Sequence, residues 1–375
     1  MSAPVLDREL FPVARTWAYC DHASVGPLPQ PTRAALVEYF DAQMLLGKNG
    51  VLPFEARRDA VRAQVAAAIN AEAGEIAFMR STSDGALLAA TGLDWHEGDE
   101  IVLADDEFGA NAYPWLNLRD RGVHIVLARA PRQRVTPELL ERLATKRTRL
   151  VAVSFVGFLD GYRNDVVGIG TWCREHGVLF AIDAMQGFGH LPLDVRACNA
   201  DLAYFGAAKW LLGPQGVSVV YVRRELIGRL RPALSSWRSV VDPMSFLDYD
   251  QPLHPDAQRF EGGTGNFPGI VALGASLGIL TSAGLGNIER HVLSLTDRLI
   301  LGARHAGIEV KSDLRAQARS GIVLLDRSGR AADMLTARFD EARVGVTVRD
   351  TGVRVSPHGY NTESDIDRVL EVLAR

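Results

Sequence analysis

Two apolar runs in the middle of the chain, each followed closely by a reactive side chain, constrain the fold most. The first, residues 178–182, runs directly into Asp183. The second, residues 202–205, stops at Gly206, and Lys209 follows three residues later. Short apolar runs with such boundaries are typical of buried strands in a parallel sheet. Because ligands of open α/β sheets bind at the carboxyl ends of the strands, we expect this carboxylate and this amine at one ligand-binding edge.

A carboxylate and an amine at one edge of a sheet form the pair that pyridoxal phosphate requires. The lysine amine forms a Schiff base with the aldehyde of the cofactor, and the carboxylate keeps the pyridine nitrogen protonated so that the ring accepts electrons. Taken singly, an aspartate after a strand is more often a turn residue, and a lone lysine is more often a solvated surface group. The two together favour catalysis by Asp183 and Lys209.

The composition of the chain argues against several other classes of protein. Its 375 residues are 47% hydrophobic, and 41 basic and 45 acidic residues are well mixed, so we expect no nucleic-acid partner. Three cysteines without metal-ligand spacing are typical of a reducing cytoplasm, which is the location we expect. The N-terminus lacks the pattern of a signal peptide, and no apolar run approaches the roughly 20 residues of a membrane span, so we expect no membrane association.

The two central segments read "IDAMQ" and "GAAKWLLGPQG", and they resemble the aspartate and lysine motifs of the class V aminotransferase family. That family includes cysteine desulfurases, kynureninase and isopenicillin N epimerase, and the resemblance extends over nearly the whole chain. It implies an α/β protein of fold-type I, with a mostly parallel seven-stranded sheet and a small α+β C-terminal domain. We predict an N-terminal arm at 1–15, a large cofactor-binding domain at 16–260 and the small domain at 261–375. Alternating strand and helix patterns independently favour a parallel sheet.

Several residues are candidate cofactor ligands by this resemblance. Gln186 matches the glutamine that hydrogen-bonds the phenolic oxygen of the cofactor. Thr82 and Ser83 follow a strand at 76–79 and begin a helix, where free N–H groups bind phosphate; an ordinary cap role is the alternative, and both roles can hold together, but the resemblance favours phosphate binding. Phe108 matches the phenylalanine that stacks on the pyridine ring in kynureninases, and its alternative role is plain core packing.

The phosphate-binding segments differ from the family in one place and agree with it in another. Relatives often have the sequence "S-x-H-K", where this chain has Gly206, Ala207 and Ala208 before Lys209. The phosphate therefore loses two side-chain partners, and backbone N–H groups must contribute more. The later segment "QRFEGGTGNFPGI" resembles the family's "RFE-x-GT-x-N", in which the threonine reaches the phosphate of a neighbouring subunit. This resemblance implies a homodimer in which Thr264 serves the partner's site.

Three further residues are candidates for binding the substrate. Arg354 in "GVRVSPHGYNT" matches the arginine that holds the α-carboxylate of an amino acid, for which a guanidinium is the natural fork. The segment "WAYCDHASVGPLPQP" resembles the family's opening segment near the substrate, which makes His22 a candidate; alternatively, it is a turn histidine bonded to the backbone. Arg163 in "GYRND" either lines the substrate pocket or forms a salt bridge.

The expected reaction begins with removal of the α-proton of an amino acid by Lys209 as general base. An aminotransferase-type reaction is favoured, and β-elimination with C–S cleavage or epimerisation are the alternatives. No cysteine follows Cys198, so the mobile nucleophilic cysteine of a cysteine desulfurase is missing, and the sequence predicts that the enzyme is not one. A nicotinamide-dependent oxidoreductase would need a GxGxxG motif, which "GFGHLP" breaks. A non-catalytic scaffold would be expected to have lost Lys209, Asp183 or Arg354.

Overall fold

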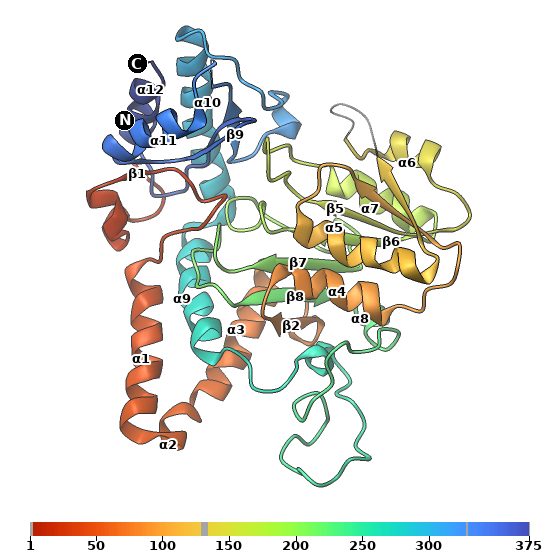
Figure 1. Cartoon of the computed structure of the whole chain (residues 1–375). Helices are drawn as coiled ribbons and strands as arrows, with labels where there is room; N and C mark the ends of the chain where they lie inside the picture. The colour runs from red at the N-terminus through yellow and green to blue at the C-terminus, as the bar shows by residue number, and fades with distance from the viewer. Residues whose placement is uncertain (1–2, 129–133, 328, 375) are drawn as a thin grey trace.

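The computed structural model describes residues 3–128, 134–327 and 329–374. A large α/β unit carries a smaller unit that contains the C-terminal part of the chain (Figure 1). The first two residues of the predicted arm and the last residue of the predicted small domain lie outside the described residues. The described arm forms two short 3₁₀ helices, η1 (Arg8–Leu10) and η2 (Pro12–Arg15).

The large unit is built on a seven-stranded sheet with the strand order β2-β8-β7-β6-β5-β3-β4. Only β8 runs antiparallel to its neighbours, which confirms the predicted mostly parallel sheet. The strands are β2 (Ile76–Met79), β3 (Glu100–Ala104), β4 (His124–Ala128), β5 (Thr148–Ser154), β6 (Leu179–Asp183), β7 (Leu202–Gly206) and β8 (Ser218–Val222).

Helices cover both faces of this sheet, so the strands are apolar on both faces (Figure 1). In β5, Val151 and Val153 point into one hydrophobic cluster, whereas Leu150 and Ala152 point into the other, as the two-residue period of a strand dictates. The first cluster is completed by α3 (Phe54–Ala68), α6 (Pro137–Leu143), α7 (Val166–Glu175) and α9 (Phe267–Ala283). The second is completed by α4 (Thr82–Gly92), α5 (Gly109–Leu116) and α8 (Arg224–Ile227).

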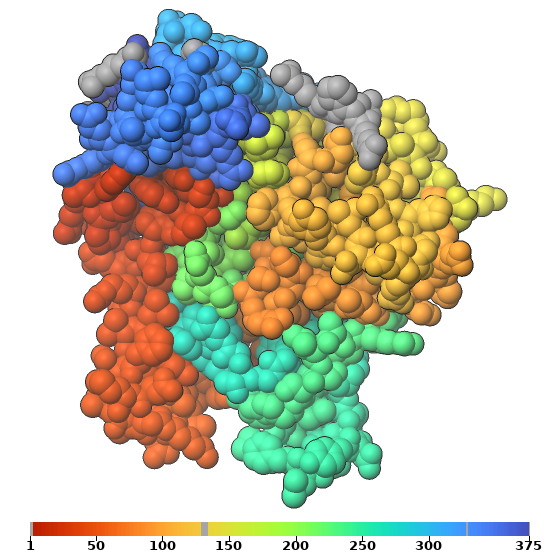
Figure 2. Space-filling view, in the orientation of Figure 1, coloured from red at the N-terminus to blue at the C-terminus, as the bar shows by residue number. Residues whose placement is uncertain are grey.

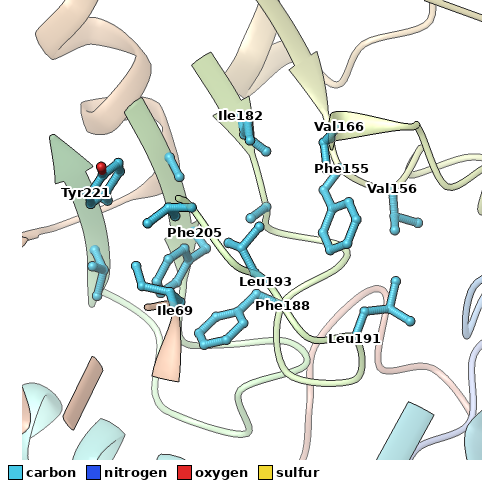
Figure 3. Close-up of a cluster of buried hydrophobic side chains, with 14 of the residues drawn as sticks. Ile69, Phe155, Val156, Val166, Ile182, Phe188, Leu191, Leu193, Phe205 and Tyr221 are labelled. Atoms are coloured by element: carbon cyan, nitrogen blue, oxygen red, sulfur yellow. The ribbon is translucent and has the colours of Figure 1, made fainter. Parts of the chain in front are cut away.

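Part of the first cluster lies under the loops that follow β5, β6 and β7 (Figure 3). Phe155 and Phe188 come from the loops after β5 and β6, Phe205 comes from β7 itself, and the ring centroids of Phe188 and Phe205 lie 4.7 Å apart. Leu191 fills the space beside them. This packing fixes the segments that carry Asp183 and Lys209.

The smaller unit has its own hydrophobic cluster, made from both ends of the chain. Ala18 and Cys20 are buried among C-terminal residues, and β1 (Ala18–Tyr19) pairs in parallel with β10 (Val344–Gly345). Figure 2 shows the N-terminal segment in red directly beneath the C-terminal part in blue. The domain boundary predicted at residue 16 stays a prediction, and this packing argues for counting the segment with the smaller unit.

The other elements complete the two units. The smaller unit contains a three-stranded sheet of order β11-β12-β9. These strands and the helices not yet given are β9 (Val323–Leu325), β11 (Thr347–Arg349), β12 (Gly352–Val355), α1 (Gln30–Leu46), α2 (Lys48–Val51), α10 (Leu285–His305), α11 (Ala332–Glu341), α12 (Glu363–Ala374), η3 (Ala73–Glu75), η4 (Asn117–Arg121), η5 (Ala257–Phe260) and η6 (Ala316–Ala318).

Within the described ranges, no single helix has both the length and the apolar character to cross a membrane. The pair α9 and α10 meets that criterion together, but it is bent by 78° at the break between the two helices. The three cysteines are free and buried, and the cytoplasmic location expected from their small number stays a prediction.

Replacing Phe188 by alanine is expected to lower the free energy of unfolding by about 3–5 kcal/mol, because the side chain is 1% exposed and its removal leaves a cavity. Chemical denaturation of the cofactor-free protein measures this change. The matched control is Phe40→Ala in α1, where the ring is 54% exposed and the expected change is below about 1 kcal/mol. Equal losses for the two variants would contradict the packing described above.

Candidate active site

Three neighbouring strands end at one edge of the sheet and bring the candidate catalytic groups together. Ser154 at the end of β5 lies beside Asp183 at the end of β6. The next strand, β7, ends at Gly206 and leads into the turn that carries Lys209. A cavity of about 390 Å³ at this edge is lined by Ser154, Asp183 and Lys209, with residues from several loops. The sequence prediction that the carboxylate and the amine face one cavity is therefore met by the geometry.

The turn carrying Lys209 is held tightly from outside. The amide of Gly26 donates a hydrogen bond of 2.8 Å to the carbonyl of Ala208, and a Cβ at position 26 would lie 2.2 Å from the carbonyl oxygen of Lys209. Leu212 has a φ of 57°, a left-handed conformation that costs a non-glycine residue on the order of 1 kcal/mol. Only glycine fits at position 26, and the surrounding packing maintains the strained turn.

Burial shifts the proton affinities of both groups. It raises the pKa of Asp183 to about 6, against the opposing effects of the Met185 amide, which donates a 2.8 Å hydrogen bond to the carboxylate, and of the nearby lysine charge. Burial also lowers the pKa of Lys209 to about 8, although the charge of Asp183 opposes this shift. Burial therefore brings the pKa of Lys209 closer to neutral pH, as a general base requires.

The side chains around the pair suit a flat aromatic ring. Gln186 is fixed by two hydrogen bonds of 2.9 Å, one donated to the carbonyl of Ala23 and one accepted from the indole of Trp210. Phe108 is 48% exposed, and its ring centroid lies 5.6 Å from Nζ of Lys209. A half-exposed ring on a cavity wall offers a face for stacking a second ring, and core packing alone does not account for it.

Thr82 and Met185 line the cavity, and Gly206 lies behind Met185. The sulfur of Met185 accepts a hydrogen bond of 3.4 Å from the hydroxyl of Thr82 and one of 3.1 Å from the amide of Gly206. A thioether is a weak acceptor, so the Thr82 hydroxyl remains available to a stronger one such as phosphate. A Cβ at position 206 would lie 3.1 Å from the terminal methyl of Met185, which thus takes the space that a larger residue would need. The residues present fit pyridoxal phosphate.

Two of the predicted phosphate ligands do not line this cavity. Ser83 lies in the first turn of α4 beside Thr82, but it is absent from the cavity wall. Thr264 is exposed and lines a separate hollow of about 130 Å³ with Arg58 and Arg238. The structure of a single chain thus does not bring Thr264 to the same chain's lysine.

On the substrate side, Arg354 lines the cavity and is 4% exposed. Its Nη1 donates to the carbonyl of Phe158 at 2.8 Å, and its Nη2 donates to the hydroxyl of Ser24 at 2.7 Å. The carboxylate of Asp21 lies 3.6 Å from Nη2. The buried Nε has no hydrogen-bond partner among the described residues. The guanidinium is thus held in place, and Nη1 keeps one of its two N–H donors for a carboxylate.

The other two predicted substrate ligands are absent from the cavity wall. Nδ1 of His22 lies 2.9 Å from the carbonyl of Ser356, and Nε2 lies 3.0 Å from the hydroxyl of Tyr360. Burial, reinforced by the nearby His358, holds the pKa of His22 well below its ordinary value. Arg163 forms an ion pair of 2.7 Å with Glu289 in α10. Both geometries favour the structural alternatives, namely a bonded turn histidine and a salt bridge.

Three residues at or next to the cavity were not identified from the sequence. Met185 and Arg349 both line the cavity. Glu107 accepts hydrogen bonds from the amide and hydroxyl of Ser154, which lines it, at 2.6 and 2.5 Å. Burial raises the pKa of Glu107 to about 7, against these hydrogen bonds, and the charge of Asp183 adds to the rise. Residues 105–107 are all acidic, so the sequence does not distinguish them. Only the fold shows that Glu107 is the one that bonds to Ser154.

Comparisons with known proteins agree with this fold and site. Residues 18–369 match the aminotransferase class-V family. The chain is 32% identical to a probable cysteine desulfurase of Methanothermobacter thermautotrophicus, over 98% of this chain and 96% of the relative. It is 28% identical to an uncharacterised aminotransferase, YcbU, of Bacillus subtilis, over 98% and 96% of the two chains.

Solved structures share the fold over nearly the whole chain. A cysteine desulfurase from Thermococcus onnurineus NA1 superimposes with a TM-score of 0.91 at 24% identity, over 100% of this chain and 98% of the other. The cystine C–S lyase C-DES, in complex with its product cysteine persulfide, superimposes with a TM-score of 0.89 at 22% identity, over 97% and 99% of the chains. The protein is therefore a pyridoxal-phosphate enzyme of fold-type I. More narrowly, it belongs to the class V aminotransferase family.

One prediction from the sequence is wrong. The absence of a cysteine after Cys198 led us to exclude a cysteine desulfurase, yet the relative at 32% identity and others along the full chain bear that name. The position of a single cysteine is a weaker criterion than similarity over 98% of the chain, because a loop residue changes more easily than a fold and its buried site.

The lowered pKa of Lys209 is testable by chemical labelling of the cofactor-free protein. Its amine is expected to react with trinitrobenzenesulfonate with a pH midpoint of about 8, and the unfolded chain should show the ordinary value of 10.5. The chain has four lysines, so peptide mapping resolves the site. Asp183→Asn should move the midpoint lower, because the carboxylate raises this pKa. A midpoint near 10.5 in the folded protein would contradict a buried lysine.

The two hydroxyls at the start of α4 are expected to differ in their effect on cofactor affinity. Thr82→Val should weaken the binding of pyridoxal phosphate about tenfold, because it removes a hydrogen-bond donor that lies on the cavity wall. Ser83→Ala is the matched control, since its hydroxyl lies off that wall. Equilibrium dialysis measures both dissociation constants, and a larger loss for Ser83→Ala would reverse this assignment.

Proposed function

We propose that this protein cleaves the C–S bond of a cysteine-type amino acid with pyridoxal phosphate as its cofactor. The main support is that one cavity is lined by Lys209, whose pKa is lowered to about 8, together with Arg354 and Asp183. The name of the relative at 32% identity, and the cystine C–S lyase among the proteins of the same fold, support a sulfur-containing substrate. When bound, pyridoxal phosphate supplies the electron sink that weakens the bonds at the substrate's Cα.

The side chains divide the work as follows. Arg354 holds the α-carboxylate of the substrate, which orients the bond from Cα to its proton. Lys209 takes that proton at Nζ, and its lowered pKa leaves a much larger fraction of the amine neutral at physiological pH than an ordinary lysine would have. Asp183 offers its carboxylate to the pyridine nitrogen, and Gln186 and Phe108 orient the ring. Thr82 donates to the phosphate, and Ser83 remains a weaker candidate for that role.

Transamination is the second candidate, and it is the reaction that the sequence favoured. The relative from Bacillus subtilis named as an uncharacterised aminotransferase keeps it open. The same Lys209 and Arg354 would serve both reactions, because the two differ only after the α-proton has been removed.

We also propose that the working unit is a homodimer in which Thr264 donates to the phosphate of the partner's site. Thr264 is exposed and lies apart from its own chain's lysine cavity, which supports this arrangement. The segment 241–249, which projects from the body of the molecule in Figure 1, exposes Met244, Phe246 and Leu247. Apolar surface of this kind is typical of an interface between chains.

The decisive experiment incubates the loaded enzyme with L-cysteine, L-cystine and S-substituted cysteines and quantifies the products. C–S cleavage predicts released sulfur species together with pyruvate or alanine. Lys209→Ala should lower the rate about 10²- to 10⁴-fold, because the general base is removed. Lys146→Ala, which changes an exposed lysine, is the matched control and should leave the rate unchanged.

Two outcomes would contradict this proposal. If the visible absorbance of the loaded enzyme bleaches with an amino acid and a 2-oxo acid restores it, the enzyme is a transaminase. If Lys209→Ala turns over like the parent, Lys209 is not the base.

A further inference from the structure

The hairpin of β11 and β12 presents two different faces. Val348 on β11 lies opposite Val353 on β12, and both pack into the hydrophobic cluster of the smaller unit. Thr347 lies opposite Arg354, and Arg349 lies opposite Gly352. Because side chains alternate along a strand, Thr347, Arg349 and Arg354 share the face that the valines do not occupy. That face borders the lysine cavity, since both arginines line it.

Gly352 is required for this arrangement. Its φ of 149° is unfavourable for other residues, and a Cβ at this position would lie 2.3 Å from the carbonyl oxygen of Leu325. The glycine also leaves the position opposite Arg349 without a side chain. The diagonal geometry of an antiparallel ladder then puts the Cα atoms of Arg349 and Arg354 roughly 7–8 Å apart, on the face of the hairpin that borders the cavity.

The two guanidinium groups are held differently. Arg354 is buried and bonded to Phe158 and Ser24. Arg349 is exposed, and within the part of the chain that the structure describes no carboxylate pairs with it. Burial lowers the pKa of Lys209, and the positive charge of Arg349 contributes to the same shift. Of the two guanidinium groups at this cavity, only Arg354 has a carboxylate nearby, and the α-carboxylate of the substrate does not account for the positive charge of Arg349.

We propose that Arg349 determines substrate specificity by binding a second negative charge, on the side chain of the amino acid whose α-carboxylate lies on Arg354. The substrate class is then an amino acid with an acidic side-chain group, such as a carboxylate or a sulfinate. For C–S cleavage, this means a cysteine derivative whose sulfur substituent is anionic. The inference rests on the proposed function in one respect only, namely that amino acids bind in this cavity.

Two amino acids without an α-proton test this assignment by binding alone. 2-Methylaspartate carries a side-chain carboxylate, whereas 2-aminoisobutyrate carries only a methyl group. Dissociation constants are measured by calorimetry on the cofactor-loaded protein. The parent is expected to bind 2-methylaspartate at least about tenfold more tightly, as a charge-assisted pair at a partly open site provides.

Variants on the same hairpin separate the two arginines. Arg349→Gln should remove the preference by weakening 2-methylaspartate about tenfold while leaving 2-aminoisobutyrate unchanged, and Arg349→Lys should retain part of it. Arg354→Gln should weaken both ligands to a similar extent, because both carry the α-carboxylate. Arg121→Gln, at an exposed arginine in η4, should change neither.

Equal affinity of the parent for the two ligands, or an equal loss of both in Arg349→Gln, would overturn the specificity role of Arg349. Binding of neither ligand would overturn both this role and the proposed function. If the preference is present and depends on Arg349 but no cysteine derivative loses its sulfur, the specificity role stands and the C–S cleavage proposal fails.

Discussion

The active site depends on one constraint of sheet geometry, namely that neighbouring parallel strands end at the same edge. The end of β6 delivers Asp183, and the turn after β7 delivers Lys209 to the same cavity. Apolar packing beneath the loops fixes both segments. Burial also raises the pKa of Asp183 and lowers the pKa of Lys209. The hydrophobic core therefore positions Asp183 and Lys209, the two groups whose protonation matters for the reaction.

The second half of the site comes from the two ends of the chain. The strand β1 pairs with β10, and an isolated bridge joins Asp21 to Ser356. This pairing sets Ser24 against Arg354, which comes from β12. The substrate side of the cavity is therefore assembled only when both termini have packed together. The cofactor side also depends on the N-terminal segment, because Gln186 donates to the carbonyl of Ala23 and the amide of Gly26 donates to the carbonyl of Ala208.

The sequence predicted those parts of the molecule that short-range patterns encode. The apolar runs at 178–182 and 202–205 correspond to the strands β6 and β7. Residues whose roles depend on long-range packing were harder to assign. His22 stands in a segment that lines the cavity through Ala23 and Ser24, but its ring turns the other way to meet Ser356 and Tyr360. Arg349 was missed because nothing in its own strand distinguishes it from a surface arginine.

The phosphate end shows how a departure from a motif can be compensated within the fold. The family's serine and histidine before the lysine are replaced by Gly206 and Ala208, so two hydrogen-bonding side chains are missing. Met185, two residues after Asp183, fills the space beside Gly206 and accepts its amide. A Cβ at position 206 would lie 3.1 Å from the terminal methyl of Met185, so a serine there would require this flexible side chain to shift slightly. Because a thioether is a weak acceptor, the Thr82 hydroxyl, which lies on the cavity wall, can donate to a phosphate instead.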